Sequence, residues 1–292
     1  MCKSAGTVVK GIGGFYYVDV GSRVVECRAR GRFRLDKKKS PLVGDNVVIA
    51  VDDGYVLEIC TRKNSFIRPP IANIDCLVIV ATVANPITDT FFIDKITTIA
   101  SFKDITPIVC INKTDLDESE KLFDVYSSAG IKTLKVSAVS GQGIDELKQA
   151  ITGKISAFAG HSGVGKSSLL NIICPKDNFE IGELSQKISR GKNTTRHTQL
   201  YPLDCGGFVA DTPGFSSFDI AMLDDITPKS LPHCFAEFEQ YLNDCRFNDC
   251  SHTKEEGCAV LGAMAESKIS RLRHSSYVRL YEQVKKNSAT YR

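Results

Sequence analysis

The chain has 292 residues, of which 42% are hydrophobic, enough for about two or three domains with buried cores. It has no apolar run long enough to span a bilayer and no signal-like N-terminal stretch, so we expect a cytoplasmic protein without membrane contact. Its eleven cysteines then indicate core thiols or metal ligands, because thiols stay reduced there. Residues 1–70 carry 13 Lys and Arg against 7 Asp and Glu, and the last 26 residues carry 7 against 1. A basic head and a basic tail indicate a polyanionic partner.

Residues 1–70 consist of short alternating or β-branched segments separated by turn signals. About five short strands in about seventy residues predict a small β-barrel of the OB type. The expected strands are 6–9, 15–20, 24–28, 46–51 and 55–59.

A basic stretch lies within this predicted barrel. Its arginines share one parity, so on a strand they would project from one face. A solvated basic loop is the alternative, but four same-face arginines and a lysine triplet favour nucleic-acid contact. The candidate RNA-binding residues are Arg28, Arg30, Arg32, Arg34, Lys37, Lys38 and Lys39.

Residues 64–72 are predicted to be a linker, and strands then alternate with helices. This pattern predicts a mostly parallel sheet with ligands at the carboxyl ends of its strands. Strands are expected at 76–83, 107–111, 132–136, 155–159 and 207–211, and helices at 91–103, 144–151 and 168–173.

The tetrapeptide N-K-T-D, residues 112–115, directly follows the second of these strands. The Asp115 carboxylate can accept hydrogen bonds from N1–H and the exocyclic amine of guanine, whereas adenine would leave it unpaired. The Lys113 stem can cover the face of the base. Ser137 and Ala138, after the next strand, would add backbone donors to the base oxygen.

Residues 155–170, ISAFAGHSGVGKSSLL, read as a strand, a G-x-x-x-x-G-K-S loop and the start of a helix. The glycines let backbone N–H groups surround a phosphate chain, and the helix N-terminus adds positive potential. Lys166 can reach the β- and γ-phosphates, and the Ser167 hydroxyl can ligate Mg²⁺. Together with N-K-T-D, this loop predicts a GTP site with Mg²⁺. The expected GTP-binding residues are Asn112, Lys113, Thr114, Asp115, Ser137, Ala138, Gly160, His161, Ser162, Gly163, Val164, Gly165, Lys166, Ser167, Ser168, Asp211 and Gly214.

Residues 185–197 are polar and contain glycine, as is typical of a nucleotide switch, although a flexible basic loop is the alternative. We expect Thr195, in preference to Thr194, to ligate Mg²⁺ beside the γ-phosphate. D-T-P-G then ends the last strand. There Asp211 would hold Mg²⁺ through water, and the Gly214 N–H would sense the γ-phosphate.

The order of these motifs is unusual. Typical GTPases carry the phosphate loop, the switch threonine and D-x-x-G before N-K-x-D and S-A, whereas here the last two come first. The same sheet can form if the original termini are joined and the chain is opened after D-x-x-G, a circular permutation. The segment after Gly214 then becomes the covalent exit to the next domain, so nucleotide state could move what is attached there.

Three cysteines and one histidine gather near the C-terminus with the spacing C-x4-C-x-H-x5-C. This donor set suits tetrahedral Zn²⁺. Chance clustering of reduced thiols is the alternative, and His233 or Cys234 could replace one ligand. The candidates are Cys245, Cys250, His252 and Cys258.

The tail, residues 268–286, is expected to be a basic helix, either solvated or in contact with RNA. Its basic residues lie mostly off the apolar face. That face is predicted to consist of Ile269, Leu272, Ser276, Leu280 and Val284.

On these motifs the chain resembles a known family, the circularly permuted, ribosome-small-subunit-dependent GTPase A. The resemblance covers nearly the full length: an OB-like barrel (1–70), a permuted α/β P-loop G domain (71–218) with GHSGVGKSS, NKTD and DTPGF, and a small, mainly α zinc-binding domain (219–292). It implies hydrolysis of GTP to GDP and phosphate, stimulated by the small (30S) ribosomal subunit, binding to its 16S rRNA, and a role in late subunit maturation. It also implies that Cys245, Cys250, His252 and Cys258 ligate one structural Zn²⁺.

The residue that positions the attacking water is unassigned. Phe215 stands where Ras-like enzymes usually carry glutamine, and Asn193 stands where many family members carry histidine, with His197 four residues on. We therefore expect slow intrinsic turnover. The rivals are an RNA-binding assembly factor for which GTP is only a switch ligand, and a GTPase acting on tRNA or another polyanion. Nothing in the sequence requires more than a monomer. The expected catalytic residues are Lys166, Ser167 and Thr195.

Overall fold

The computed structural model describes residues 2–30, 40–117, 120–175, 198–211 and 223–290. The chain divides into two compact units, each built from segments distant in sequence. The first comprises Met1–Cys76, Lys148–Phe158 and Ser167–Ser216; the second comprises Leu77–Leu147, Ala159–Lys166 and Ser217–Arg292. Among the described helices, every one is too short or too polar to cross a lipid bilayer.

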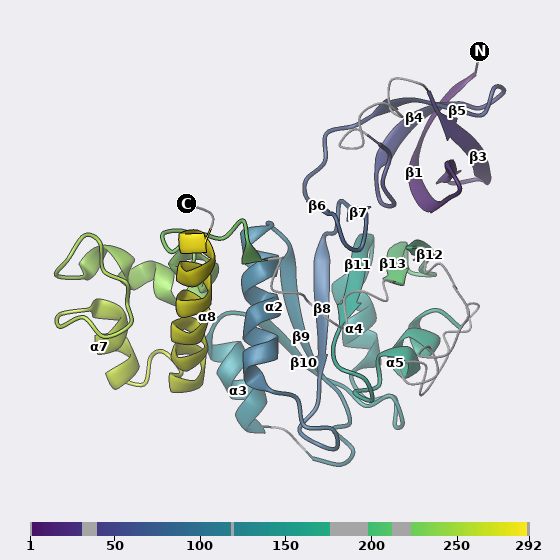
Figure 1. The fold of residues 1–292 in the computed structure, drawn as a ribbon. Helices are drawn as coiled ribbons and strands as arrows, with labels where there is room; N and C mark the ends of the chain where they lie inside the picture. The colour runs from purple at the N-terminus through teal and green to yellow at the C-terminus, as the bar shows by residue number, and fades with distance from the viewer. Residues whose placement is uncertain (1, 31–39, 118–119, 176–197, 212–222, 291–292) are drawn as a thin grey trace, which may run out of the picture. The chain divides into compact units, whose positions relative to one another are not determined.

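A five-stranded barrel forms the N-terminal part of the first unit (Figure 1). Its strands follow the order β1-β2-β3-β5-β4, and β4 returns to pair with β1, which closes the barrel. The pairing of β3 with β5 is parallel and the other pairings are antiparallel. The predicted OB-like barrel is therefore confirmed. Its strands are β1 (Lys3–Ile12), β2 (Phe15–Asp19), β3 (Val24–Ala29), β4 (Asn46–Ala50) and β5 (Tyr55–Ile59).

Alternation along β3 separates the barrel core from its basic surface. Cys27 and Ala29 are buried in the core, whereas Arg28 and Arg30 are exposed. Because side chains on a strand point to opposite faces in turn, Arg28 lies on the outer side, and Arg30 directly follows the strand. The core that fixes this register consists of Val8, Val18, Cys27, Ala29, Val47, Ile49 and Val56.

The predicted linker at 64–72 is instead a small ordered hairpin. Its strands β6 (Ser65–Phe66) and β7 (Ile71–Ala72) pair antiparallel, and both residues of β7 are fully buried. The Asn73 side chain donates to the carbonyl of Gly44 at 2.9 Å, which ties the hairpin's end to the barrel. Strands of two residues are too short to show an alternating pattern, so the sequence did not indicate them. The two prolines of this segment instead suggested a linker.

The rest of the first unit includes strands of the α/β part. The strand before the phosphate loop, β11 (Lys154–Ala159), runs parallel to β13 (Gly207–Asp211), as expected. A strand that was not predicted, β12 (Gln199–Pro202), pairs antiparallel with β13 and meets β1 at Lys10. The helix after the loop is α5 (Lys166–Ile173).

The second unit contains strands in the order β10-β9-β8, with β10 parallel to β9. All six residues of β8 are buried, as a continuous apolar run predicts. The bounds are β8 (Cys76–Ala81), β9 (Thr106–Ile111), β10 (Lys132–Lys135), α2 (Thr90–Phe102), α3 (Glu120–Ser128) and α4 (Ile144–Ile151).

The C-terminal part of this unit is mainly helical. Two 3₁₀ helices, η4 (Pro232–Cys234) and η5 (Ala236–Asp244), precede α7 (Ala259–Ala265) and α8 (Arg271–Thr290). Figure 1 shows α8 lying alongside α2. Together with the barrel and the α/β part, this confirms the predicted multidomain fold class.

The buried face of α8 differs from the predicted one, because Arg273, His274 and Tyr277 are buried although none was predicted to be. Leu272, expected on the apolar face, is 52% exposed, whereas Arg273 is only 1% exposed. Arg273 turns inward because two carboxylates from distant parts of the chain, Asp94 and Glu237, receive its guanidinium. The remaining inward positions, Ile269, Ser276, Leu280 and Val284, were predicted correctly.

Candidate functional site

The phosphate loop, residues 160–166, follows β11 and requires its glycines. Gly160 and Gly165 have φ values of +150° and +94°, in the region that favours glycine. A Cβ on Gly165 would lie 2.2 Å from the Asn112 side-chain nitrogen, and one on Gly160 would lie 2.5 Å from the Val80 carbonyl oxygen. Only a residue without a side chain fits at either position.

The Lys166 side chain folds back onto the phosphate loop. Its Nζ donates to the carbonyls of Gly160, at 2.6 Å, and His161, at 2.7 Å. Burial lowers the pKa of Lys166 to about 8, because the charged amine loses hydration. A phosphate chain in the loop would favour the protonated form and receive its hydrogen bonds.

Asn112, the first residue of N-K-T-D, joins the phosphate loop to Ala138 of the predicted S-A motif. Its side-chain Nδ2 donates to the Val164 carbonyl at 2.8 Å, and its Oδ1 accepts from the Ala138 N–H at 3.2 Å. Asn112 is 2% exposed, so this cross-link is shielded from water. The residue that begins N-K-T-D therefore brings three of the predicted motifs together.

Asp115 is exposed at the carboxyl edge of the sheet, and one of its oxygens is already held. The Ser137 hydroxyl donates to Asp115 Oδ1 at 2.5 Å, while Thr114 is anchored by its hydroxyl to the Val136 carbonyl at 2.9 Å. This arrangement orients the carboxylate and leaves Oδ2 available to a base. Ser137 thus contributes a side-chain role that the sequence did not reveal, beside the backbone role predicted for it.

Two residues that contact the predicted motifs, Asn85 and Phe92, were not predicted from the sequence. The Lys113 Nζ donates to the Asn85 carbonyl at 2.6 Å, which ties the N-K-T-D loop to the segment after β8. The Phe92 ring lies 3.9 Å, centroid to centroid, from the ring of His161 in the phosphate loop. Burial lowers the pKa of His161, and the Lys166 charge lowers it further, which favours the neutral imidazole. No motif marks Asn85 or Phe92, because their positions depend on the fold.

The predicted magnesium site is only partly described. Ser167 lies in the first turn of α5 and Ser168 follows it, while Asp211 is the last residue of β13. Thr195, the preferred second Mg²⁺ ligand, lies outside the described residues. So do Asn193, His197, Gly214 and Phe215. The expected magnesium set therefore stays a prediction.

Three cysteines and one histidine in the second unit form a candidate metal centre. Their ligand atoms all lie within 4.8 Å of one another, and His252 Nδ1 is 3.5 Å from the sulfurs of both Cys245 and Cys258. Three sulfurs and one imidazole nitrogen in a compact group fit tetrahedral Zn²⁺. The group comprises Cys245, Cys250, His252 and Cys258.

The two alternative ligands lie elsewhere. His233 is exposed, with its Nδ1 3.1 Å from a Glu239 carboxylate oxygen. Cys234 is buried, and its sulfur donates to the Ser230 carbonyl at 3.5 Å. Neither belongs to the cluster.

The loop that carries His252 is held by hydrogen bonds from its surroundings. The Glu255 carboxylate accepts from the backbone N–H groups of Ser251, Thr253 and Lys254, each at 3.0 Å. Burial opposes the charge of Glu255, but these bonds and the one from the Ser251 hydroxyl outweigh it and lower its pKa to about 2. Glu255 is thus a fixed anion that shapes the loop.

The described part of the basic barrel segment has a surface suited to stacking. The Arg28 guanidinium lies over the Phe15 ring, 4.6 Å from its centroid, and both Arg28 and Arg30 are exposed. Arg32, Arg34, Lys37, Lys38 and Lys39 lie outside the described residues.

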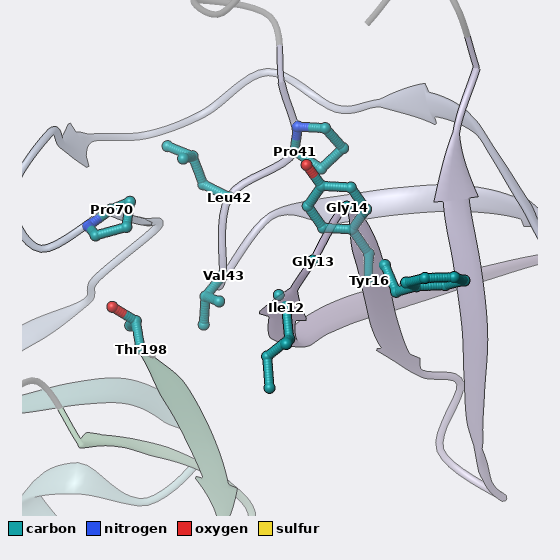
Figure 2. A pocket seen from close by; sticks show the side chains of 11 residues that line it. Ile12, Gly13, Gly14, Tyr16, Pro41, Leu42, Val43, Pro70 and Thr198 are labelled. Atoms are coloured by element: carbon teal, nitrogen blue, oxygen red, sulfur yellow. The ribbon is translucent and has the colours of Figure 1, made fainter. Parts of the chain in front are cut away.

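A cavity of about 240 Å³ opens beside the β1–β2 turn in the first unit (Figure 2). Ile12, Leu42 and Val43 line it, with Thr198 at its side. The described residues around it carry no charged side chain. It offers nothing to neutralise a triphosphate, so the phosphate loop remains the nucleotide-site candidate.

Known proteins resemble this chain over almost its whole length. The family profile described as RsgA GTPase matches residues 59–221, and the RsgA N-terminal domain matches residues 5–56. The small ribosomal subunit biogenesis GTPase RsgA of Caldanaerobacter subterraneus is 46% identical over 286 residues, covering 96% of this chain and 95% of that protein. Its counterpart in Clostridium perfringens is 40% identical over 284 residues, covering 96% and 97%.

Solved structures agree with this assignment. YjeQ from Thermotoga maritima superposes with a TM-score of 0.84 at 34% identity, covering 97% of this chain and 99% of its own. YloQ, described as a circularly permuted GTPase, gives a TM-score of 0.81 at 35% identity, covering 98% and 96%. The motif order, the barrel and these matches lead to one conclusion: the chain belongs to the RsgA family of GTPases.

Proposed function

We propose that this GTPase hydrolyses GTP to GDP and phosphate in response to the small ribosomal subunit, binds its 16S rRNA and acts in late 30S maturation. The observation that carries the nucleotide part is the Asn112 cross-link, which joins the phosphate loop and the base-reading loops in one buried contact. The names of the relatives in Caldanaerobacter and Clostridium support the ribosomal part. A ribosomal partner would place this activity in the cytoplasm.

In the proposed mechanism each motif has one task. Asp115, oriented by Ser137, reads the guanine base, and Lys113 covers its face. Lys166 and the loop N–H groups hold the phosphates as charge develops on the γ-phosphoryl group. Ser167 and Thr195 would hold Mg²⁺, which neutralises the phosphate oxygens. No residue is assigned to orient water, so intrinsic turnover is expected to be slow.

The proposed domains are an RNA-binding barrel (1–70), a nucleotide-binding G domain (71–218) and a zinc-binding domain (219–292). Arg28, stacked on Phe15, supports RNA contact by the barrel, because planar cations and aromatic rings both stack on bases. The zinc-binding part follows the D-x-x-G motif directly in sequence. Its connection to the nucleotide site is therefore covalent.

Co-sedimentation of the full-length protein with purified small subunits tests the proposed partner. We expect more protein to pellet with a non-hydrolysable GTP analogue than with GDP, and less pelleting of Arg28→Ala than of wild type at raised salt. Lys132→Ala, which removes an exposed lysine from the other unit, is the matched control. Equal pelleting in both nucleotide states, or full competition by tRNA, would favour a different polyanion.

A further inference from the structure

Helix α8 is tied to the loop of the candidate zinc centre. The Tyr277 hydroxyl donates to the Ser251 carbonyl at 2.8 Å, and His274 Nε2 lies 2.8 Å from the carbonyl oxygen of His252. These carbonyls belong to a candidate ligand and to the residue before it. Both Tyr277 and His274 are buried, so the loop backbone is fixed to the face of α8.

Two other α8 side chains, those of Arg273 and Arg279, contact the first half of α2. The Arg273 Nη1 donates to Asp94 Oδ1 at 2.7 Å, with both side chains 1% exposed. Nearly one turn closer to the start of α2, Arg279 covers the Phe91 ring, with the guanidinium carbon 3.7 Å from its centroid. These contacts fix α8 on α2, and Figure 1 shows the two helices side by side.

The same end of α2 touches the phosphate loop. Asp89 caps the helix by accepting a hydrogen bond from the Phe91 N–H at 3.0 Å. The next residue, Phe92, packs its ring on His161, whose carbonyl receives the Lys166 amine. A shift of the first turn of α2 would therefore change the loop that holds the phosphates.

We propose that α8 and α2 couple the zinc centre to the phosphate loop, so that zinc retention and nucleotide binding strengthen each other. The contacts form a continuous series: zinc loop, Tyr277 and His274, α8, Arg279 and Arg273, α2, Phe92, His161. Each helix is a rigid element, so loosening one end changes the packing at the other. Linkage then requires that each ligand improve the affinity of the other by the same factor. The inference rests on the proposed zinc and nucleotide sites and adds a dependence of one on the other.

The rate of zinc release to a chromogenic chelator, from the full-length protein with and without GDP, reports this coupling, because GDP that strengthens zinc binding without changing zinc capture slows release by the same factor. The zinc content and GDP dissociation constant of each variant are determined first. We expect GDP to slow zinc release by at least about fivefold, the lower end of typical coupling. In Arg279→Gln and Phe92→Leu the effect of GDP should fall below about half of that, although both variants still bind zinc and GDP. Lys285→Gln removes an exposed charge from the same helix and should retain the full effect.

Two results would overturn the coupling. One is zinc release that GDP does not change in wild type; the other is an unchanged GDP effect in both Arg279→Gln and Phe92→Leu. A purified protein that holds no zinc, or binds no GDP, would instead refute the proposed site itself and the coupling with it. A merely structural role of Arg279 would lower stability and leave the ratio of release rates with and without GDP as in wild type.

Discussion

Replacing Arg273 with methionine removes the centre of a buried ion cluster. Arg273 donates to Glu237 Oε1 and Oε2, at 2.7 and 3.1 Å, and to Asp94 Oδ1 at 2.7 Å. Methionine retains much of the apolar volume but leaves two carboxylates in the interior without their counter-charge. Losing one partner of a buried ion pair costs about 3–5 kcal/mol, and with two carboxylates stranded we expect the upper end of that range.

The pH dependence distinguishes this mechanism from lost packing. Burial raises the pKa of Asp94, and the Arg273 charge counteracts that rise. Without Arg273, the folded-state pKa rises further above the unfolded value, so the penalty is full at high pH and shrinks as the pH falls and the carboxyl takes a proton. Urea unfolding followed by circular dichroism, at about pH 8 and about pH 5.5, should show the smaller deficit at the lower pH.

Two outcomes would refute this reasoning about Arg273. One is a deficit below about 1 kcal/mol, the typical effect of a point substitution of any kind. The other is a deficit of equal size at both pH values, which would point to packing alone. Lys285→Met, an exposed substitution on the same helix, provides the baseline.

Three further predictions address the nucleotide and metal sites. Asp115→Asn should weaken GDP binding by at least about 100-fold, because the amide has one acceptor oxygen and no charge, and its NH2 group cannot accept from the guanine amine. The same NH2 group can donate to the second carbonyl of xanthine, so binding of xanthosine diphosphate should improve. Competition against a fluorescent nucleotide measures both affinities, and unchanged GDP affinity would argue against base reading by Asp115. The affinity for GDP should be constant at pH values below the Lys166 pKa of about 8 and should fall by up to about tenfold per pH unit above that pKa, since only the protonated amine binds phosphate. In Lys166→Arg the affinity should not fall over this pH range, because the guanidinium stays protonated. Cys258→Ser should lose bound zinc, measured by atomic emission, and should melt at a lower temperature than wild type. Cys205 is an exposed cysteine outside the cluster, so Cys205→Ser should retain its zinc. Equal zinc content in the two variants would contradict the assigned centre.

Local patterns in the sequence predicted much of the fold. The helix at 144–151 and the strands at 55–59 and 207–211 have the predicted bounds, because apolar spacing and flanking glycines mark them. The candidate metal cluster was also predictable, since its four donors lie close together in sequence. The spacing left His233 and Cys234 open as ligands, and only the fold places them elsewhere.

Features that depend on distant segments could not be predicted. Arg273 belongs to the buried face of α8 because Asp94 lies 179 positions away along the chain, and no helical periodicity contains that information. The same holds for Phe92 against His161 and for Ser137 against Asp115. The short strands β6 and β7 are stabilised by burial, and the proline-rich composition of the segment does not predict them.

Phosphate release from GTP, measured with and without saturating purified small ribosomal subunits, tests the central proposal most directly. Lys166→Ala, which removes the phosphate-binding amine, is the blank. We expect a slow rate for the protein alone and strong stimulation by the subunits that disappears in the variant. A rate that stays at background while GTP still binds would contradict the account and identify a nucleotide-gated RNA binder instead.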